Sequence, residues 1–399
     1  MSQSSYICAF NRDRDSYQVP LTLAENGKLE KFITDYYVTP KMRIKGLEHR
    51  QIDGIKSEST SSTLKAIAIQ ASWKKAVKIL PNLKFPEMRV DECISNHVRS
   101  YTQTSQSNLL IYNNYAKTFS DPWNNNKLRI LFQFHPAPRF IEKMMSNFDL
   151  PVSTQEPEIR FFKKFSKRSD EEISNSNHIL CASTFTKKSL IFSGYPAEKI
   201  TVIPYGCPEP TIRITKEKTG PLRFVFLGSA VKRKGIDLLL EIWPTFHSIT
   251  GAELYVISRI IDKNIKLTDH PSITYSNGFS KKDLTEFLIE MDALVLPSLI
   301  EGFGLVITEA LSCGLHIVAT ENTGLLDLDL PSTLGTLISE GVNHENLLNG
   351  LLKSTFEIIS NRNEIKDLAQ SFSIENSWNN YRKKLAYELE KIEWDFFHG

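Results

Sequence analysis

Two glutamates, Glu301 and Glu309, bracket a glycine loop in the segment EGFGLVITE. Carboxylates accept hydrogen bonds and suit a ligand that is rich in hydroxyl groups. Glycines in the loop let the backbone turn tightly and approach a ligand, because they carry no Cβ. The backbone N–H groups expected to be free to bind an anion are those of Phe303, Gly304 and Leu305. A ligand with phosphates between two polyols fits this set, and a nucleotide sugar is such a ligand.

The elements around this loop are predicted to be a strand, a helix and a second strand. Residues 293–296 and 316–319 are short apolar runs that predict buried parallel strands. The helix between them is predicted to begin near Thr308 and to end at Gly314. In a doubly wound sheet, ligands lie at the carboxyl ends of strands and against helix N-termini, so both glutamates are expected to face one ligand. In the alternative interpretation, the helical glutamate only complements the helix dipole and the loop glutamate is solvated.

This segment resembles a known protein family. Glu301, Gly302, Phe303 and Gly304, with seven residues between Glu301 and Glu309, are similar to the E-x7-E signature of retaining glycosyltransferases of the group 1 (family 4) type. That family has the GT-B fold, and the resemblance extends from about residue 179 to the C-terminus and more faintly through the N-terminal half. The resemblance implies that Glu301 contacts the hydroxyls of the donor sugar and that Glu309 contacts the nucleotide ribose.

Gly228 opens a second candidate loop, GSAVKRKG, after a predicted strand at residues 222–227. A glycine, close cationic side chains and a helix start favour a phosphate site with Lys234 as its charge. The loop also resembles the family's diphosphate loop, in which an arginine follows the first glycine and a lysine precedes the second. Lys234 matches this pattern, whereas Ser229 stands in the place of the arginine. The diphosphate contact of that arginine is therefore either missing or supplied by Arg233. In the alternative interpretation, Lys234 is a solvated loop lysine.

A histidine, His135, follows a clear apolar strand, LRILFQF, at residues 128–134. It is expected at the carboxyl end of that strand, where ligands lie. It resembles the family's cleft histidine, which contacts the donor sugar or the acceptor; the alternative is a histidine hydrogen-bonded into the domain interface. Arg139 is a weaker candidate for the acceptor site. Phe279 matches a glycine–aromatic corner that lies against the nucleobase in the family, although a core phenylalanine is an equal alternative.

The loop after the first predicted strand, residues 6–10, has the sequence NRDRD and lacks the glycines that the family usually has there. Arg12 and Arg14 would suit an anionic acceptor. Two D-x-D patterns are present, and both are interpreted as solvated loop residues because metal-binding D-x-D belongs to a different transferase fold. These aspartates are Asp13 and Asp15 in the first pattern, and Asp327 and Asp329 in the second.

Composition excludes several classes of protein. The chain has 399 residues and 41% hydrophobic residues, which suits two domains of ordinary composition. The longest apolar runs are too short to span a bilayer, and the N-terminus does not resemble a signal peptide. The five cysteines are dispersed and lack C-x-x-C spacing, so disulfides and zinc sites are not expected and a reducing cytoplasm is predicted.

Charge is distributed unevenly along the chain. Residues 1–207 hold 29 Lys and Arg against 20 Asp and Glu, whereas the remainder holds 19 against 26. The first half is therefore expected to face something anionic, such as a phosphorylated acceptor or a membrane surface. Residues 63–80 predict a basic amphipathic helix, which either contacts an anionic bilayer peripherally or is an ordinary surface helix. Nucleic-acid binding ranks last, because the basic half carries no aromatic–basic motif.

These patterns predict an α/β protein with two Rossmann-like domains facing a central cleft, the GT-B fold. Residues 1–207 are the predicted acceptor-binding domain and residues 208–379 the donor-binding domain, with a helix at about 380–399 crossing back to the first. The predicted reaction moves a hexosyl group from a nucleoside diphosphate sugar to a saccharide or lipid-linked acceptor, with retention and without metal or cofactor. Surface polysaccharide or glycoconjugate synthesis is the expected setting. The alternatives are a sugar-nucleotide epimerase of the same fold and a non-catalytic subunit that binds nucleotide sugars.

Overall fold

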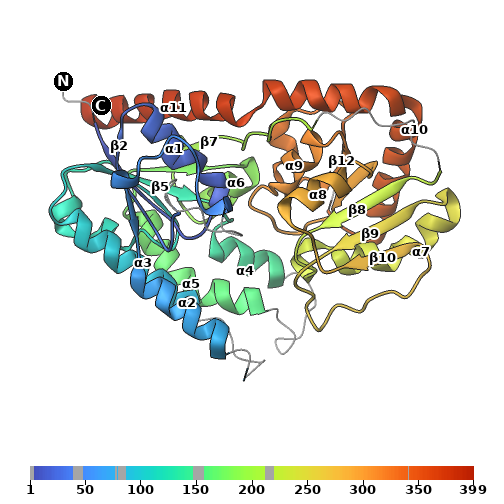
Figure 1. Ribbon diagram of the computed structural model, residues 1–399, viewed down its shortest axis with the longest axis horizontal. Coiled ribbons are helices and arrows are strands. Elements are labelled where there is room, and N and C mark those ends of the chain that lie inside the picture. The colour runs from blue at the N-terminus through green and yellow to red at the C-terminus, as the bar shows by residue number, and fades with distance from the viewer. Residues whose placement is uncertain are drawn as a thin grey trace.

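The computed structural model describes residues 4–38, 48–76, 79, 87–146, 157–211, 220–339 and 341–399. Two parallel sheets, each covered by helices, lie side by side, and two long C-terminal helices run along one edge over both (Figure 1). This arrangement confirms the predicted α/β fold with two Rossmann-like units.

The first sheet has seven parallel strands in the order β3-β2-β1-β4-β5-β6-β7. Cys8 of β1 pairs with Phe32 on one side and with Leu110 on the other. The central strands are buried along their whole length, because a parallel sheet has helices on both faces. The strands are β1 (Tyr6–Ala9), β2 (Leu29–Thr34), β3 (Thr60–Ser62), β4 (Asn108–Tyr112), β5 (Arg129–Gln133), β6 (His178–Cys181) and β7 (Ile200–Val202).

The second sheet has six parallel strands in the order β10-β9-β8-β11-β12-β13. Its strand order reverses between β8 and β11, and that of the first sheet reverses between β1 and β4. Loops that leave the carboxyl ends of such neighbouring strands diverge and open a ligand site. The strands are β8 (Arg223–Leu227), β9 (Glu253–Ile257), β10 (Ile273–Ser276), β11 (Ala293–Leu296), β12 (His316–Thr320) and β13 (Gly335–Ile338).

Helices link the strands in both domains. In the first they are α1 (Gln18–Glu25), α2 (Leu64–Ala76), α3 (Glu87–Thr102), α4 (Pro138–Ser146), α5 (Pro157–Ser174) and α6 (Thr184–Phe192). In the remainder they are α7 (Ile236–Thr250), α8 (Lys281–Leu288), α9 (Val306–Ser312), α10 (His344–Glu375) and α11 (Trp378–His398). Two short 3-10 turns matter for the site, η8 (Lys232–Lys234) and η9 (Gly324–Leu328).

The last helix, α11, confirms the predicted return to the first domain (Figure 1). Glu393 accepts hydrogen bonds from the Lys28 ammonium at 3.0 Å and from the Tyr6 hydroxyl at 2.8 Å. Arg382 donates to Glu25 of α1 at 2.8 Å. Apolar residues of α11, including Leu385 and Leu389, are buried against the first domain's core. The C-terminal helix therefore completes the first domain.

Several element boundaries differ from the prediction. Helix α9 begins at Val306, two residues before the predicted start at Thr308. Helix α7 passes through Pro244, and the Thr268 hydroxyl donates to the Leu240 carbonyl that lacks its helical partner there. Of the basic helix predicted at 63–80, the structure describes a helix from Leu64 to Ala76; residues 77, 78 and 80, which include Lys78, lie outside the described residues. No helix in the described ranges is long and apolar enough to cross a membrane.

Candidate functional site

Glu301 lies in the loop after β11, and its side chain is almost fully buried between two cations. The Lys234 ammonium donates to its Oε2, and the Arg233 guanidinium lies 3.6 Å from the same oxygen. The other carboxylate oxygen, Oε1, accepts from the Gly302 N–H at 3.2 Å. The two predicted loops of the second domain thus meet at one carboxylate, because both leave the carboxyl ends of the neighbouring strands β8 and β11.

Backbone contacts fix the basic turn η8 against the loop after β11. The N–H of Leu299 donates to the Arg233 carbonyl at 2.8 Å. Gly235 has a φ of 67°, and a Cβ there would collide with the Pro297 carbonyl oxygen. Only glycine fits both conditions. The turn that Gly235 allows places the Lys234 side chain against Glu301.

His135 of the first domain meets this group across the domain junction. A Cβ on Gly302 would collide with the Phe134 carbonyl oxygen and would lie 3.4 Å from the His135 Cα. Burial of the imidazole, and then the positive charges of Arg233, Arg14 and Lys234, hold its pKa well below the ordinary value. His135 is therefore neutral at neutral pH and offers one N–H donor and one ring-nitrogen acceptor.

Hydroxyl groups from the first domain hold the same glycine loop. The hydroxyls of Ser183 and Thr186, at the start of α6, both donate to the Gly302 carbonyl, the latter at 3.1 Å. A small apolar cluster beside them joins Ile141 and Phe185 of the first domain to Ile300 of the second. The position of Glu301 is therefore set by both domains.

The remaining residues of the E-x7-E segment have different environments. Glu309 lies partly exposed in the first turn of α9, and Leu305 is its N-cap residue. Gly304 has a φ of 88°, which reserves the turn before the helix for glycine. The Phe303 ring is buried edge-on to Tyr205, with ring centroids 5.2 Å apart, and packs where Gly324 leaves room. The Phe303 ring therefore belongs to the core, and only its backbone N–H remains a candidate for the predicted anion site.

Residues predicted for the diphosphate and the base lie around the edge of the second domain. Gly228 has a φ of 142° and open space at its Cβ position, and Ser229 after it is partly exposed. The Phe279 ring stacks on Phe287 with centroids 4.9 Å apart, and its carbonyl accepts from Arg259 at 2.5 Å. Phe279 therefore has a core-type partner on one face, while its side chain remains partly exposed.

The predicted acceptor residues are not brought together by the structure. The Arg12 side chain is exposed, and the Arg12 backbone N–H donates to Asp35 at 3.0 Å. Arg139 is exposed on α4 and donates to Asp170 of α5 at 2.8 Å. Arg14 instead reaches the junction, with its guanidinium carbon 3.7 Å from the Phe134 ring centroid. The sequence suggested both Arg12 and Arg14 for an anionic acceptor. The fold shows that Arg14 lies at the domain junction and that the Arg12 side chain is exposed.

Two aspartates predicted to be solvated are not. Asp15 is 2% exposed, accepts a hydrogen bond from the Tyr112 hydroxyl, and has its pKa raised by burial to about 7. Asp327 accepts from the Thr184 N–H at 2.9 Å, and so joins η9 of the second domain to the start of α6 in the first. The prediction was wrong for both, because their partners are distant in sequence. Asp13 and Asp329 are exposed as predicted.

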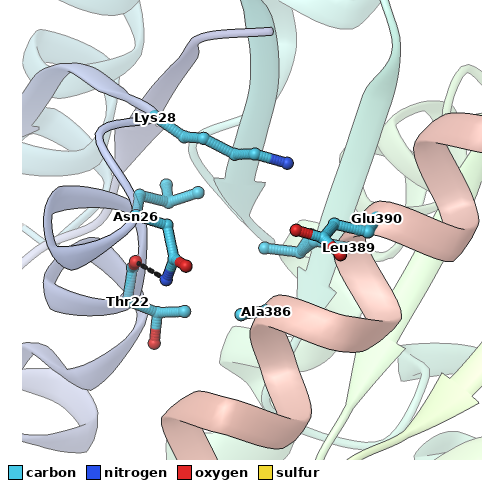
Figure 2. A pocket seen from close by; sticks show the side chains of 7 residues that line it. Thr22, Asn26, Lys28, Ala386, Leu389 and Glu390 are labelled. Carbon is cyan, nitrogen blue, oxygen red and sulfur yellow. Dashed lines mark hydrogen bonds between the residues drawn. The ribbon is translucent and has the colours of Figure 1, made fainter. Parts of the chain in front are cut away.

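A surface crevice elsewhere on the first domain is separate from this junction. It lies between α1 and α11, and Figure 2 shows the side chains that line it, with Asn26 hydrogen-bonded to the Thr22 carbonyl at 2.8 Å. Its lining includes Leu23, Lys28 and Leu389, and none of the predicted site residues. Within the described ranges, no cluster of three or more His, Cys, Asp or Glu is arranged to hold a metal ion.

Comparison with known proteins places this geometry in a class. Residues 221–353, which contain Lys234, Glu301 and Glu309, match the family described as glycosyl transferases group 1. The solved structure of WaaG, a glycosyltransferase involved in lipopolysaccharide biosynthesis, aligns over 99% of this chain and 100% of its own with a TM-score of 0.62 and 15% identity. The chain therefore has the GT-B fold of glycosyltransferases.

Curated proteins that are similar in sequence to this chain carry the names of glycosyltransferases. A human protein, one of the subunits of phosphatidylinositol N-acetylglucosaminyltransferase, is 27% identical over 241 residues, which are 55% of this chain and 47% of the relative. The amylovoran biosynthesis glycosyltransferase AmsK of Erwinia amylovora is 28% identical over 178 residues, 41% of this chain and 44% of the relative. The chain spans about half the length of the curated relatives it matches. Its second domain is similar to the group 1 glycosyltransferases, and these relatives do not favour the epimerase or the non-catalytic alternative.

Proposed function

We propose that this protein transfers a hexosyl group from a nucleoside diphosphate sugar to a saccharide or lipid-linked acceptor, with retention of anomeric configuration. One observation carries the proposal. Lys234 and Arg233 surround Glu301 in the second domain, and the neutral His135 of the first domain lies against the same loop. A domain junction with cations, a buried carboxylate and a neutral imidazole suits a charged leaving group attached to a hydroxyl-rich sugar.

The donor would bind to the second domain. The diphosphate would contact Lys234, Arg233 and the N–H groups at the start of α9, while Glu309 would accept hydrogen bonds from the ribose. Arg233 would replace the arginine that the family has where this chain has Ser229. The sugar hydroxyls would donate to Glu301 once the ligand displaces the Lys234 contact. The nucleobase would lie against the edge at Phe279.

Bond cleavage builds negative charge on the departing diphosphate. The bond from the anomeric carbon to the phosphate oxygen breaks with its electron pair on that oxygen, and the acceptor oxygen bonds to the same face of the carbon. The acceptor proton passes to the departing phosphate. Lys234, Arg233 and the preorganised N–H groups stabilise this charge without a metal or cofactor. His135 positions the sugar or the acceptor through neutral hydrogen bonds.

The names of the relatives support a role in glycoconjugate or surface polysaccharide synthesis. One is a transferase for phosphatidylinositol, and another acts in amylovoran biosynthesis. We infer an acceptor of this kind and contact with an anionic membrane surface through the basic first half of the chain.

Ligand binding and product analysis test the proposal. Thermal stability is measured with a panel of nucleoside diphosphates and their sugars on wild type, Glu309→Gln and Glu345→Gln, which alters an exposed glutamate in the first turn of α10. One nucleotide at 100 times its Kd should stabilise wild type and Glu345→Gln by about 2.7 kcal/mol, and Glu309→Gln by less. Release of nucleoside diphosphate in the presence of acceptor extracts, with the product anomer assigned by NMR, reports transfer and retention. If no nucleotide stabilises the wild type, the proposal fails.

A further inference from the structure

Arg14 is a cation at the domain junction that the donor chemistry does not use. It lies in the loop that follows the carboxyl end of β1. The strand order of the first sheet reverses there, between β1 and β4. The Arg14 guanidinium carbon lies over the Phe134 ring, 3.7 Å from the centroid, and the Phe134 and His135 ring centroids are 4.7 Å apart. Arg14 therefore lies in the first domain close to His135, and its charge acts on that imidazole together with those of Arg233 and Lys234.

The backbone that presents Arg14 is held in an unusual conformation. Asp15, Ser16 and Tyr17 have φ values of 44°, 51° and 62°, in a region that glycine normally occupies. The buried Asp15 carboxylate accepts the Tyr112 hydroxyl from β4 and so anchors this turn to the sheet. Such conformations persist where surrounding contacts determine them, and they concentrate at ligand sites. The loop thus keeps a glycine-like path while carrying a cationic side chain.

The charges around Arg14 differ from those around the two donor-side cations. Lys234 and Arg233 share the Glu301 carboxylate. Arg14 faces the Tyr115 hydroxyl and the Asp15 carboxyl, whose pKa is raised to about 7, so that its negative charge is incomplete at neutral pH. The buried Nε of Arg14 has no hydrogen-bond partner within the part of the chain that the structure describes.

We propose that Arg14, stacked on Phe134, binds an oxyanion of the acceptor, so that the acceptor saccharide carries a phosphate or carboxylate group. A planar guanidinium held on an aromatic face presents its N–H groups in one direction, which suits an oxyanion with two oxygens. The donor diphosphate has its own cations in the second domain, so the anion at Arg14 belongs to the other substrate. This inference rests on the proposed function, because it needs a second substrate in the cleft.

Four probes test the assignment on protein saturated with the nucleoside diphosphate that binds it. Glucose 6-phosphate, glucuronate, inorganic phosphate and glucose are titrated into wild type, Arg14→Gln and Arg12→Gln, and thermal stability is recorded. At least one anionic probe should raise the Tm of wild type and Arg12→Gln in a saturable manner, glucose should not match it, and Arg14→Gln should lose the response. Which probe responds distinguishes a phosphate from a carboxylate. Arg14→Lys, which keeps the charge without the planar group, should retain part of the response.

Donor binding separates this proposal from the preceding one. The nucleoside diphosphate should stabilise all three variants as it stabilises wild type, which also shows that they are folded. The oxyanion assignment is overturned if no anion stabilises wild type, if glucose is as effective as the anions, or if Arg14→Gln keeps the response. Failure of every nucleotide to bind wild type would instead refute the transferase proposal, and the anion titrations without nucleotide would still report on Arg14.

Discussion

Lys234 and Glu301 form an ion pair and neutralise one another. The pair is largely buried, and Arg233 lies close to the same carboxylate. An internal ion pair of this kind keeps two charged groups in place without an unpaired buried charge, a state that would be strongly unfavourable. A bound donor would exchange this pair for two separate contacts, one from Lys234 to phosphate and one from a sugar hydroxyl to Glu301.

Replacing Lys234 by methionine should lower kcat by about 100-fold or more, because one donor to the developing phosphate charge is removed. KM for the donor should rise as well, since the ground-state diphosphate also carries charge. Steady-state rates of nucleoside diphosphate release measure both constants. Lys232→Met, in the same 3-10 turn, is the matched control and should leave kcat close to wild type. Equal losses in the two variants would show that general charge, not the Lys234 position, is responsible.

The buried Asp15 carboxyl should make the free energy of unfolding fall as the pH rises. Its pKa is about 7 in the folded state and near 3.8 when unperturbed, with burial as the leading cause. Between these values the folded state binds more protons than the unfolded state, so the free energy of unfolding falls as pH rises, by up to about 1.4 kcal/mol per pH unit. Asp15→Asn removes this contribution, and should equal wild type near pH 4 and exceed it in stability at pH 8.

Urea unfolding of wild type, Asp15→Asn and the exposed Asp13→Asn between pH 4 and 8 measures that difference. Glu172 is also buried and has its pKa raised to about 7, so wild type alone would not isolate Asp15. The gap between wild type and Asp15→Asn should widen with pH, and that between wild type and Asp13→Asn should stay constant. A gap that does not change with pH for Asp15→Asn would contradict the buried, protonated carboxyl.

At the residue scale, local sequence patterns could predict candidate site residues only where those residues are close together in the sequence. The E-x7-E segment and the lysine before Gly235 each lie within one short loop, so local sequence and the family resemblance indicated them as candidates, and the fold brings Lys234 to Glu301. Arg14 and Asp15 acquire their environments from Phe134 and Tyr112, about 100 residues away, and no local spacing encodes such contacts. The same reason explains why Asp327 was misjudged.

At the scale of elements, the glycine loop acts as the contact between the domains. Gly302 packs without a side chain against the backbone at Phe134, and its carbonyl accepts the Thr186 hydroxyl at 3.1 Å. The loop therefore connects the first-domain strand β5 to the second-domain helix α9. Any atom added at Gly302 must push these two elements apart.

Gly302→Ala should reduce turnover by about 100-fold, because a shift of about 1 Å in the domain junction misplaces His135 relative to Glu301. Nucleotide binding should change much less, since the donor residues all belong to the second domain. Gly335→Ala is the control: a Cβ there meets only side-chain atoms of leucines, at 3.3 to 3.5 Å, and the backbone is not left-handed. Rates and nucleotide Kd values are compared for both variants. Unchanged turnover in Gly302→Ala would mean that the observed domain contact is not part of the reactive arrangement.

Apolar runs predicted β1, β5, β8, β11 and β12, because parallel strands are buried on both faces. The edge strand β3, with the sequence TSS and only partial burial, gives no such pattern and was not predicted. Strands β2 and β4 were also not identified. Helix α7 extends past Pro244 because Thr268, from a distant loop, satisfies the Leu240 carbonyl. Boundaries that depend on such tertiary partners are not readable from the sequence.

At the scale of the whole molecule, two backbone hydrogen bonds join the segment between the domains to the junction of α10 and α11. The Cys207 N–H donates to the Asn376 carbonyl at 2.8 Å, and the Trp378 N–H donates to the Cys207 carbonyl at 3.1 Å. Gly206 passes close to the Trp378 backbone, where a Cβ would lie 2.8 Å from the nitrogen. The interdomain segment and the α10–α11 junction are therefore hydrogen-bonded to each other.

Replacing Glu393 tests whether α11 unfolds together with the first domain. Its carboxylate, 14% exposed, accepts from Lys28 at 3.0 Å, from Tyr6 at 2.8 Å and from Ser4 at 2.6 Å, so it joins the last helix to the start of the chain. Glu393→Gln should destabilise the protein by about 2 kcal/mol, because the largely buried Lys28 ammonium loses its counter-charge. Hydrogen exchange should then accelerate in β1 and β2 as well as in α11, while Glu390→Gln, an exposed change on the same helix, should leave exchange unaltered. Faster exchange confined to α11 would show instead that the helix is an appendage whose release leaves the first domain folded.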